Sequence, residues 1–149
     1  HCSYLHIAGH GSTTADDSLQ VGFQLSDGIF TLRHLAGCNT DSGTLAVLLT
    51  CDSAAGDTQT PNEALHVAGA AHQAGFPDVI AATMPVRDAS TLPVVRALYQ
   101  ALDAAPNAAS DIVPAALDVA AQTLRLGPAT ATDPLSWVPY AHFRAGLSF

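Results

Sequence analysis

The chain has 149 residues, a formal net charge of −8, five arginines and no lysine. This length suits one hydrophobic core rather than two ordinary domains, and a hydrophobic content of 48% argues against disorder. Five scattered arginines do not build the basic face that a nucleic-acid-binding protein needs, so the composition excludes that class. The longest apolar run, Leu45–Leu49, is far too short to span a membrane.

The cysteines indicate the redox compartment of the protein, and the first residue indicates that the chain is part of a longer polypeptide. Cys2, Cys38 and Cys51 are odd in number and widely spaced, which argues against a disulfide framework and favours a reducing, cytoplasmic compartment. The chain opens on His1 rather than Met, and an apolar segment follows almost at once. We therefore expect residues 1–149 to form one domain in the C-terminal part of a longer polypeptide.

The first part of the chain predicts several short elements before the longest apolar run. We expect a buried strand at 4–8 and a tight polar loop at 9–12. A hairpin that turns at Asp27-Gly28 is expected at 21–31, and a short helix capped by Thr31 is expected at 31–37. Leu45–Thr50 is apolar on both faces, as in a central parallel strand that is covered on each side.

The rest of the chain alternates helices and strands. Helices are expected to begin at the capping box Thr60–Glu63 and after Ser90 and Ser110. Strands are expected at Asp78–Thr83 and Tyr140–Ala145. This alternation predicts an α/β sandwich with a mainly parallel sheet.

His10 and Cys51 each follow a predicted buried strand, at the edge where α/β sheets bind ligands. If the two strands are neighbours, a thiol and an imidazole meet there. The thiolate is then a nucleophile and the imidazole carries the proton to the leaving amine. The backbone N–H groups of Gly11 and Cys51 are candidates for an oxyanion hole.

Two other interpretations of these residues stay open at this point. Cys51 also suits a buried structural thiol, with His10 as an ordinary loop histidine. Cys2, His6 and His10 suggest metal ligands, but a structural zinc site needs about four ligands in close-spaced pairs, so no metal is expected. Cys38, at a helix end, is expected to be a packing residue.

Six segments, taken in order, resemble the motifs of one family. Leu5–Gly11 is similar to the strand that ends in the "HG" signature of the caspase-like peptidase clan, and Leu48–Gly56 is similar to the nucleophile segment of CHAT domains, a branch of that clan. The remaining matches are Asp27–Leu35, Ala74–Ala81, Val86–Asp88 and Trp137–Gly146.

This resemblance implies a caspase-like three-layer sandwich and a cysteine endopeptidase without a cofactor. Two earlier strands of the family's sheet would lie upstream or on another chain. Catalysis would fall to Cys51 and His10, acting on a protein or peptide substrate. Upstream repeat or sensor domains would be possible regulatory partners, and neither a nucleic acid nor a membrane is expected as a partner. The rival hypothesis is a catalytically silent regulatory module on the same fold.

Three residues are candidates for the substrate pocket. In separase-like relatives an acid at a place similar to Asp88 receives a basic residue, so the resemblance implies cleavage after Arg or Lys. Asp52, beside the nucleophile, is an alternative acidic contact. Met84 stands where family members often carry Trp, which would favour an apolar pocket, and Ser53 replaces the usual Thr.

Overall fold

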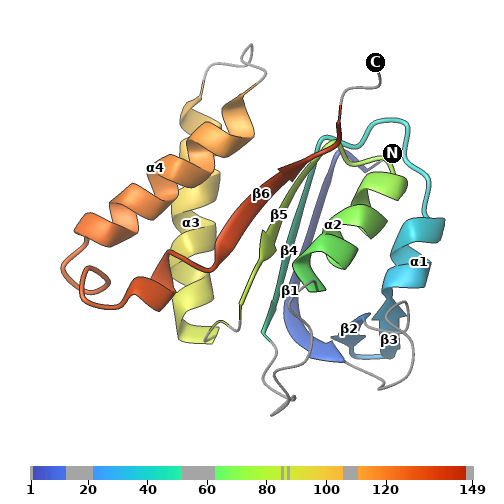
Figure 1. Ribbon diagram of the computed structural model, residues 1–149, viewed down its shortest axis with the longest axis horizontal. Coiled ribbons are helices and arrows are strands. Elements are labelled where there is room, and N and C mark those ends of the chain that lie inside the picture. Colours follow the sequence, from blue (N-terminus) through green and yellow to red (C-terminus); the bar gives the residue numbers. More distant parts are fainter. Residues whose placement is uncertain are drawn as a thin grey trace.

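The computed structural model describes residues 2–12, 22–51, 63–84, 86, 88–105 and 111–146. Its centre is a six-stranded sheet in the order β3-β2-β1-β4-β5-β6, with helices on both faces (Figure 1). The strands are β1 (Tyr4–Ser12), β2 (Gly22–Leu25), β3 (Gly28–Thr31), β4 (Leu45–Cys51), β5 (Asp78–Ala82) and β6 (Tyr140–Arg144). The helices are α1 (Leu32–Gly37), α2 (Glu63–Gln73), α3 (Asp88–Ala104) and α4 (Ile112–Leu126), with a 3₁₀ turn η1 at Pro134–Ser136.

The middle of the sheet is parallel. β4 pairs in parallel with β1 on one side and with β5 on the other, and β6 closes the sheet antiparallel to β5. Residues Leu45–Leu49 are buried on both faces, which confirms the central strand that their unbroken apolar character predicts.

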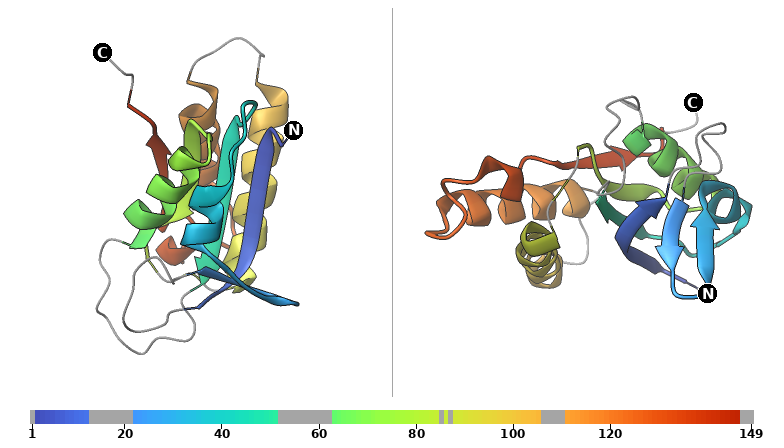
Figure 2. Two further views of the ribbon diagram at one scale, coloured as in Figure 1. Left: turned by 90° about the vertical axis from the view of Figure 1, so that its right-hand side faces the viewer. Right: turned by 90° about the horizontal axis from the view of Figure 1, so that it is seen from below.

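One layer of helices covers each face of this sheet, and alternate residues of β4 pack against each layer. Ala46 and Leu48 pack in a cluster with residues of α1 and α2, whereas Val47 and Leu49 pack in a second cluster with residues of α3 and α4. The two helix pairs lie on opposite sides of the strands (Figure 1), as the view from below also shows (Figure 2). The predicted caspase-like three-layer α/β sandwich is therefore confirmed.

The hairpin and the first helix follow from local chemistry. β2 and β3 form the antiparallel hairpin that the Asp-Gly signal predicts, but the turn lies at Ser26-Asp27 and Gly28 already begins β3. A Cβ at Gly22 would collide with the backbone of Phe30, so the close approach of these two strands requires glycine there. Thr31 caps α1 by accepting from the His34 amide, while the His34 ring accepts from the Thr31 amide.

Two predicted boundaries are wrong. The polar loop expected at 9–12 is the end of β1, because Gly9 and His10 pair with β4 while Gly11 and Ser12 pair with β2. Pairing to neighbours on both sides here outweighs the low strand propensity of glycine. α3 begins at Asp88 rather than after Ser90. The predicted start signals at Thr60–Asn62 and Ser110 lie outside the described residues.

Within the described ranges, no helix combines the length and the apolar character that crossing a membrane requires.

Candidate catalytic edge of the sheet

The candidate residues gather where three parallel strands end. β1 ends with His10-Gly11-Ser12, β4 ends at Cys51, and Met84 follows the end of β5. Parallel strands bring their carboxyl ends to one edge of the sheet, which is where open α/β sheets bind ligands. In Figure 1 these ends of β1, β4 and β5 point toward the same side of the molecule.

His10 and Cys51 are direct register partners across β1 and β4. Neighbouring strands lie about 4.8 Å apart, and register partners share one face of the sheet. Leu49 and Val47, which alternate with position 51, pack toward α3 and α4, so the backbone assigns positions 10 and 51 to that face. The His10 side chain is exposed, and the Cys51 side chain lies outside what the structure describes.

Gly11 continues β1 beyond this pair and is half-buried. It is the register partner of Phe23, which is 1% exposed and belongs to the cluster under α1 and α2. The hairpin therefore fixes the backbone of Gly11 beside positions 10 and 51, and the Gly11 amide stays a candidate oxyanion donor.

On the other side of β4, the backbone before Met84 is held by the residue that precedes β6. The amide and the hydroxyl of Thr83 both donate to the Pro139 carbonyl, at 2.6 and 3.0 Å. Met84 is 40% exposed. β5 lies on the far side of β4 from β1, as the sequence predicts for the strand before Asp88.

The acidic candidates are only partly placed. Asp88 is the first residue of α3, the helix that follows β5, and its side chain lies outside the described part of the chain. Asp52 lies outside the described residues altogether.

A contact that the sequence did not reveal joins β1 to α3 on the same face. The Tyr99 hydroxyl lies 3.2 Å from Nδ1 of His6, and the two ring centroids are 5.6 Å apart. Burial lowers the pKa of His6 and, together with the charge on Tyr4, raises the pKa of Tyr99. His6 precedes His10 on the same side of β1, so this contact anchors α3 beside the strand that presents His10.

His6 therefore has a partner other than a metal ion. Among the residues that the structure describes, no group of three or more His, Cys, Asp or Glu side chains is arranged to hold a metal.

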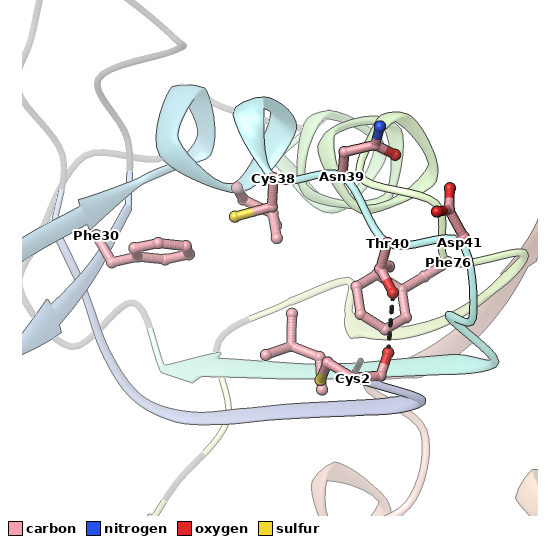
Figure 3. A pocket seen from close by; sticks show the side chains of 9 residues that line it. Cys2, Phe30, Cys38, Asn39, Thr40, Asp41 and Phe76 are labelled. Atoms are coloured by element: carbon pink, nitrogen blue, oxygen red, sulfur yellow. Dashed lines mark hydrogen bonds between the residues drawn. The ribbon is translucent and has the colours of Figure 1, made fainter.

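The other two cysteines lie elsewhere. Cys2 and Cys38 are both exposed and line a cavity of about 450 Å³ together with Leu5, Phe30 and Phe76 (Figure 3). The Thr40 hydroxyl donates to the Cys2 carbonyl at 3.2 Å, which ties the start of β1 to the segment after α1. Cys2 precedes β1, so this cavity belongs to the opposite end of the strand from His10. The expectation that Cys38 is a packing residue is wrong, because α1 ends before it and leaves it at the surface.

The comparisons with known proteins agree with the topology. The family model described as the CHAT domain matches residues 1–145. A comparison with curated proteins found no match.

Proposed function

Because the chain belongs to the CHAT domain family, a caspase-like, protease-related family, we propose that it is a cysteine endopeptidase that cleaves protein substrates with Cys51 and His10. One observation carries this proposal, namely the register that sets positions 10 and 51 side by side at the carboxyl edge of the sheet. A fold alone does not give an activity, whereas a nucleophile beside a base is a chemical reason for one.

The proposed reaction starts with transfer of the Cys51 thiol proton to the His10 imidazole. The thiolate attacks the scissile carbonyl carbon, and the backbone N–H groups of Gly11 and Cys51 donate to the oxyanion that forms. The imidazolium then gives its proton to the amine as the C–N bond breaks, which leaves a thioester on Cys51. Water, deprotonated by His10, attacks the thioester and releases the carboxylic acid product and the thiol.

One feature supports proton transfer by His10, and another supports oxyanion binding by Gly11. His10 is exposed, so its ring has access to solvent protons between turnovers. Gly11 has no side chain to keep a substrate carbonyl away from its amide. The proposed mechanism uses no cofactor.

Within this proposal, Asp88 receives a basic side chain before the cut. Asp88 begins α3 directly after the segment that follows β5, and β5 is the neighbour of β4. A carboxylate there pairs with a guanidinium through two parallel hydrogen bonds, and the net charge of −8 attracts a basic substrate at longer range. Asp52 is the alternative acid, and the exposed Met84 is the residue around which an apolar pocket would form. Upstream repeat or sensor domains are the proposed regulators.

The test is cleavage of a peptide library by the purified protein and by Cys51→Ala. We expect cleavage by the native protein and its complete loss in the variant. The substitution removes one sulfur at the end of a strand, so the fold should survive, and the circular dichroism spectrum checks this. Cys38→Ala is the matched control, because Cys38 is exposed at the far end of the sheet, and it should cleave normally.

Two results would contradict the proposal. Undiminished cleavage by Cys51→Ala would remove Cys51 from the reaction. A folded native protein that neither cleaves the library nor reacts at Cys51 with a peptide bearing a thiol-directed electrophile would instead support the catalytically silent regulatory module.

A further inference from the structure

The outer face of the α3–α4 pair carries apolar side chains that nothing in the described structure covers. Leu92 is 63% exposed on α3, and Val119 and Leu126 are 51% and 76% exposed on α4. Between the two helices lies a groove of about 470 Å³ that Leu92, Arg96 and Thr123 help to line. Large exposed apolar groups that gather around a groove usually mark an interaction surface.

Four exposed residues of α3 form one stripe along the helix. Leu92, Arg96, Gln100 and Asp103 follow one another at intervals of about one helical turn, and all four are exposed. Val94 and Leu98, on the opposite side of the helix, are buried against the sheet. The inner side of α3 is therefore buried against the sheet, whereas the stripe is accessible to another molecule.

The neighbouring face of α4 is built in the same way. Val119, Thr123 and Leu126 are exposed and recur at one-turn spacing, while Ala120 and Leu124 are buried. Because Thr123 lines the groove together with Leu92 and Arg96, the exposed residues of α4 continue the surface of α3. We call these seven residues of α3 and α4, with the groove between them, the outer helical face.

The charges on the α3 stripe are complementary to themselves. The side chains of Arg96 and Asp103 form no hydrogen bond or ion pair within the described part of the chain. They lie two helical turns apart on one side of the helix. When two copies of such a helix meet antiparallel about a twofold axis near Tyr99 and Gln100, each Arg96 lies opposite Asp103 of the second copy. A twofold interface requires such a self-complementary patch.

Charge also favours a second copy over an unrelated acidic or basic partner. The whole chain carries a net charge of −8, so two copies repel each other over most approaches. The α3 stripe holds one base and one acid and is locally neutral, so two copies that meet there make no like-charge contact at the interface.

We propose that the outer helical face is the interface between two copies of this chain, with α3 antiparallel to α3 of the second copy. Leu92, Val119 and Leu126 supply its apolar contacts, and reciprocal Arg96–Asp103 pairs set its register. α3 begins near the carboxyl edge of the sheet and runs toward the amino edge. An antiparallel pairing therefore directs the two catalytic edges to opposite ends of the dimer and leaves both open to substrate.

The experiment is a charge exchange followed by sedimentation velocity across a concentration series. Four proteins are compared with the native one, namely Arg96→Asp, Asp103→Arg, the double variant and the control Arg125→Asp. Arg125 is an exposed residue of α4 outside the outer helical face, so its substitution makes the same change in charge elsewhere. Circular dichroism checks that each variant is folded.

We expect the native protein to form a dimer whose dissociation constant rises about tenfold or more in each single variant. The double variant restores each pair with its charges exchanged, so its dissociation constant should return to within about threefold of the native value. Arg125→Asp should dimerise like the native protein. A native protein that stays monomeric up to the highest soluble concentration would overturn the proposal. A dimer whose dissociation constant is unchanged by the single substitutions would overturn the proposal as well. So would a double variant whose dissociation constant does not return toward the native value. None of these outcomes depends on peptidase activity.

Discussion

The two ends of the central sheet are built from the same strands but with different chemistry. At the amino end of β5, Asp78 accepts hydrogen bonds from His142 at 2.7 Å and from Arg144 at 2.9 Å. Arg144 also donates to Asp111 at 2.8 Å, which links β6 to the start of α4. At the carboxyl end, strand register brings positions 10 and 51 together, and His10 and Met84 are exposed.

We propose that this difference separates polar residues that stabilise the fold from polar residues that take part in catalysis. The acid and bases around Asp78 are matched to one another in charge, and they join β5, β6 and α4. The residues at the carboxyl end are instead brought together by the direction of the parallel strands. Titratable side chains alone therefore do not mark the site; the end of the sheet at which they stand does.

After the complete loss expected of Cys51→Ala, the largest effect on activity should come from His10→Ala. Loss of general acid–base assistance is expected to lower kcat by a factor of about 10²–10⁴, because thiolate formation and proton transfer to the amine both depend on the imidazole. Steady-state kinetics on a cleaved peptide measures this effect. His66→Ala, which removes an exposed histidine of α2, is the matched control and should leave kcat unchanged. A His10→Ala enzyme with native kcat would remove His10 from the mechanism.

A smaller effect is expected from Asp88→Ala, and it should be confined to substrate choice. Charge-assisted hydrogen bonds contribute about 1.5–3 kcal/mol, which corresponds to a factor on the order of 10–100 in the preference for Arg over norleucine before the cut. Ratios of kcat/KM for two peptides that differ only at this residue report the preference, and Asp52→Ala tests the alternative acid. If Arg and Lys are not preferred by the native enzyme, or if Asp88→Ala leaves the preference intact, the assignment of Asp88 is wrong. Preferred cleavage after Leu or Met would point to a pocket around Met84.

The smallest effect on activity should come from the other end of the sheet. Asp78→Ala removes the acceptor shared by His142 and Arg144, and it should lower the free energy of unfolding by about 1–2 kcal/mol. Its kcat/KM should stay within about twofold of the native value. Urea denaturation measures the stability. Asp118→Ala, which removes an exposed acid that accepts a hydrogen bond from Gln122 on the same helix, should change the free energy of unfolding by less than about 0.5 kcal/mol. A loss of activity in folded Asp78→Ala would contradict the division between the two ends.

The sequence predicted those parts of the molecule that depend on strong local patterns. The apolar run of β4, the hairpin of β2 and β3 and the Thr31 cap of α1 each have a local physical cause, and the structure confirms all three. The sequence left the adjacency of β1 and β4 as a condition of the candidate site, and the parallel pairing of the two strands meets that condition.

What the sequence did not predict depends on contacts between distant residues. β1 continues through Gly9–Ser12 because β2 and β4 pair with those residues, and a local pattern of glycine and polar residues indicates a loop instead. The contact between His6 and Tyr99 joins a strand to a helix far along the chain, and no sequence motif predicts it. The sequence predicted a helix after Ser90 but not which of its sides is exposed, because that depends on how α3 packs against the sheet.

The central claim is that His10 activates Cys51, and the pH dependence of Cys51 alkylation tests it most directly. Iodoacetamide is added at a series of pH values, and mass spectrometry of the digested protein follows each cysteine separately in the native protein and in His10→Ala. A neighbouring imidazole stabilises a thiolate, so the native midpoint for Cys51 should lie at least about one pH unit below that of His10→Ala, which should approach the ordinary thiol value of about 8.5. Cys2 and Cys38, at the far end of β1, should react alike in both proteins. The same midpoint for Cys51 in both proteins would contradict the account.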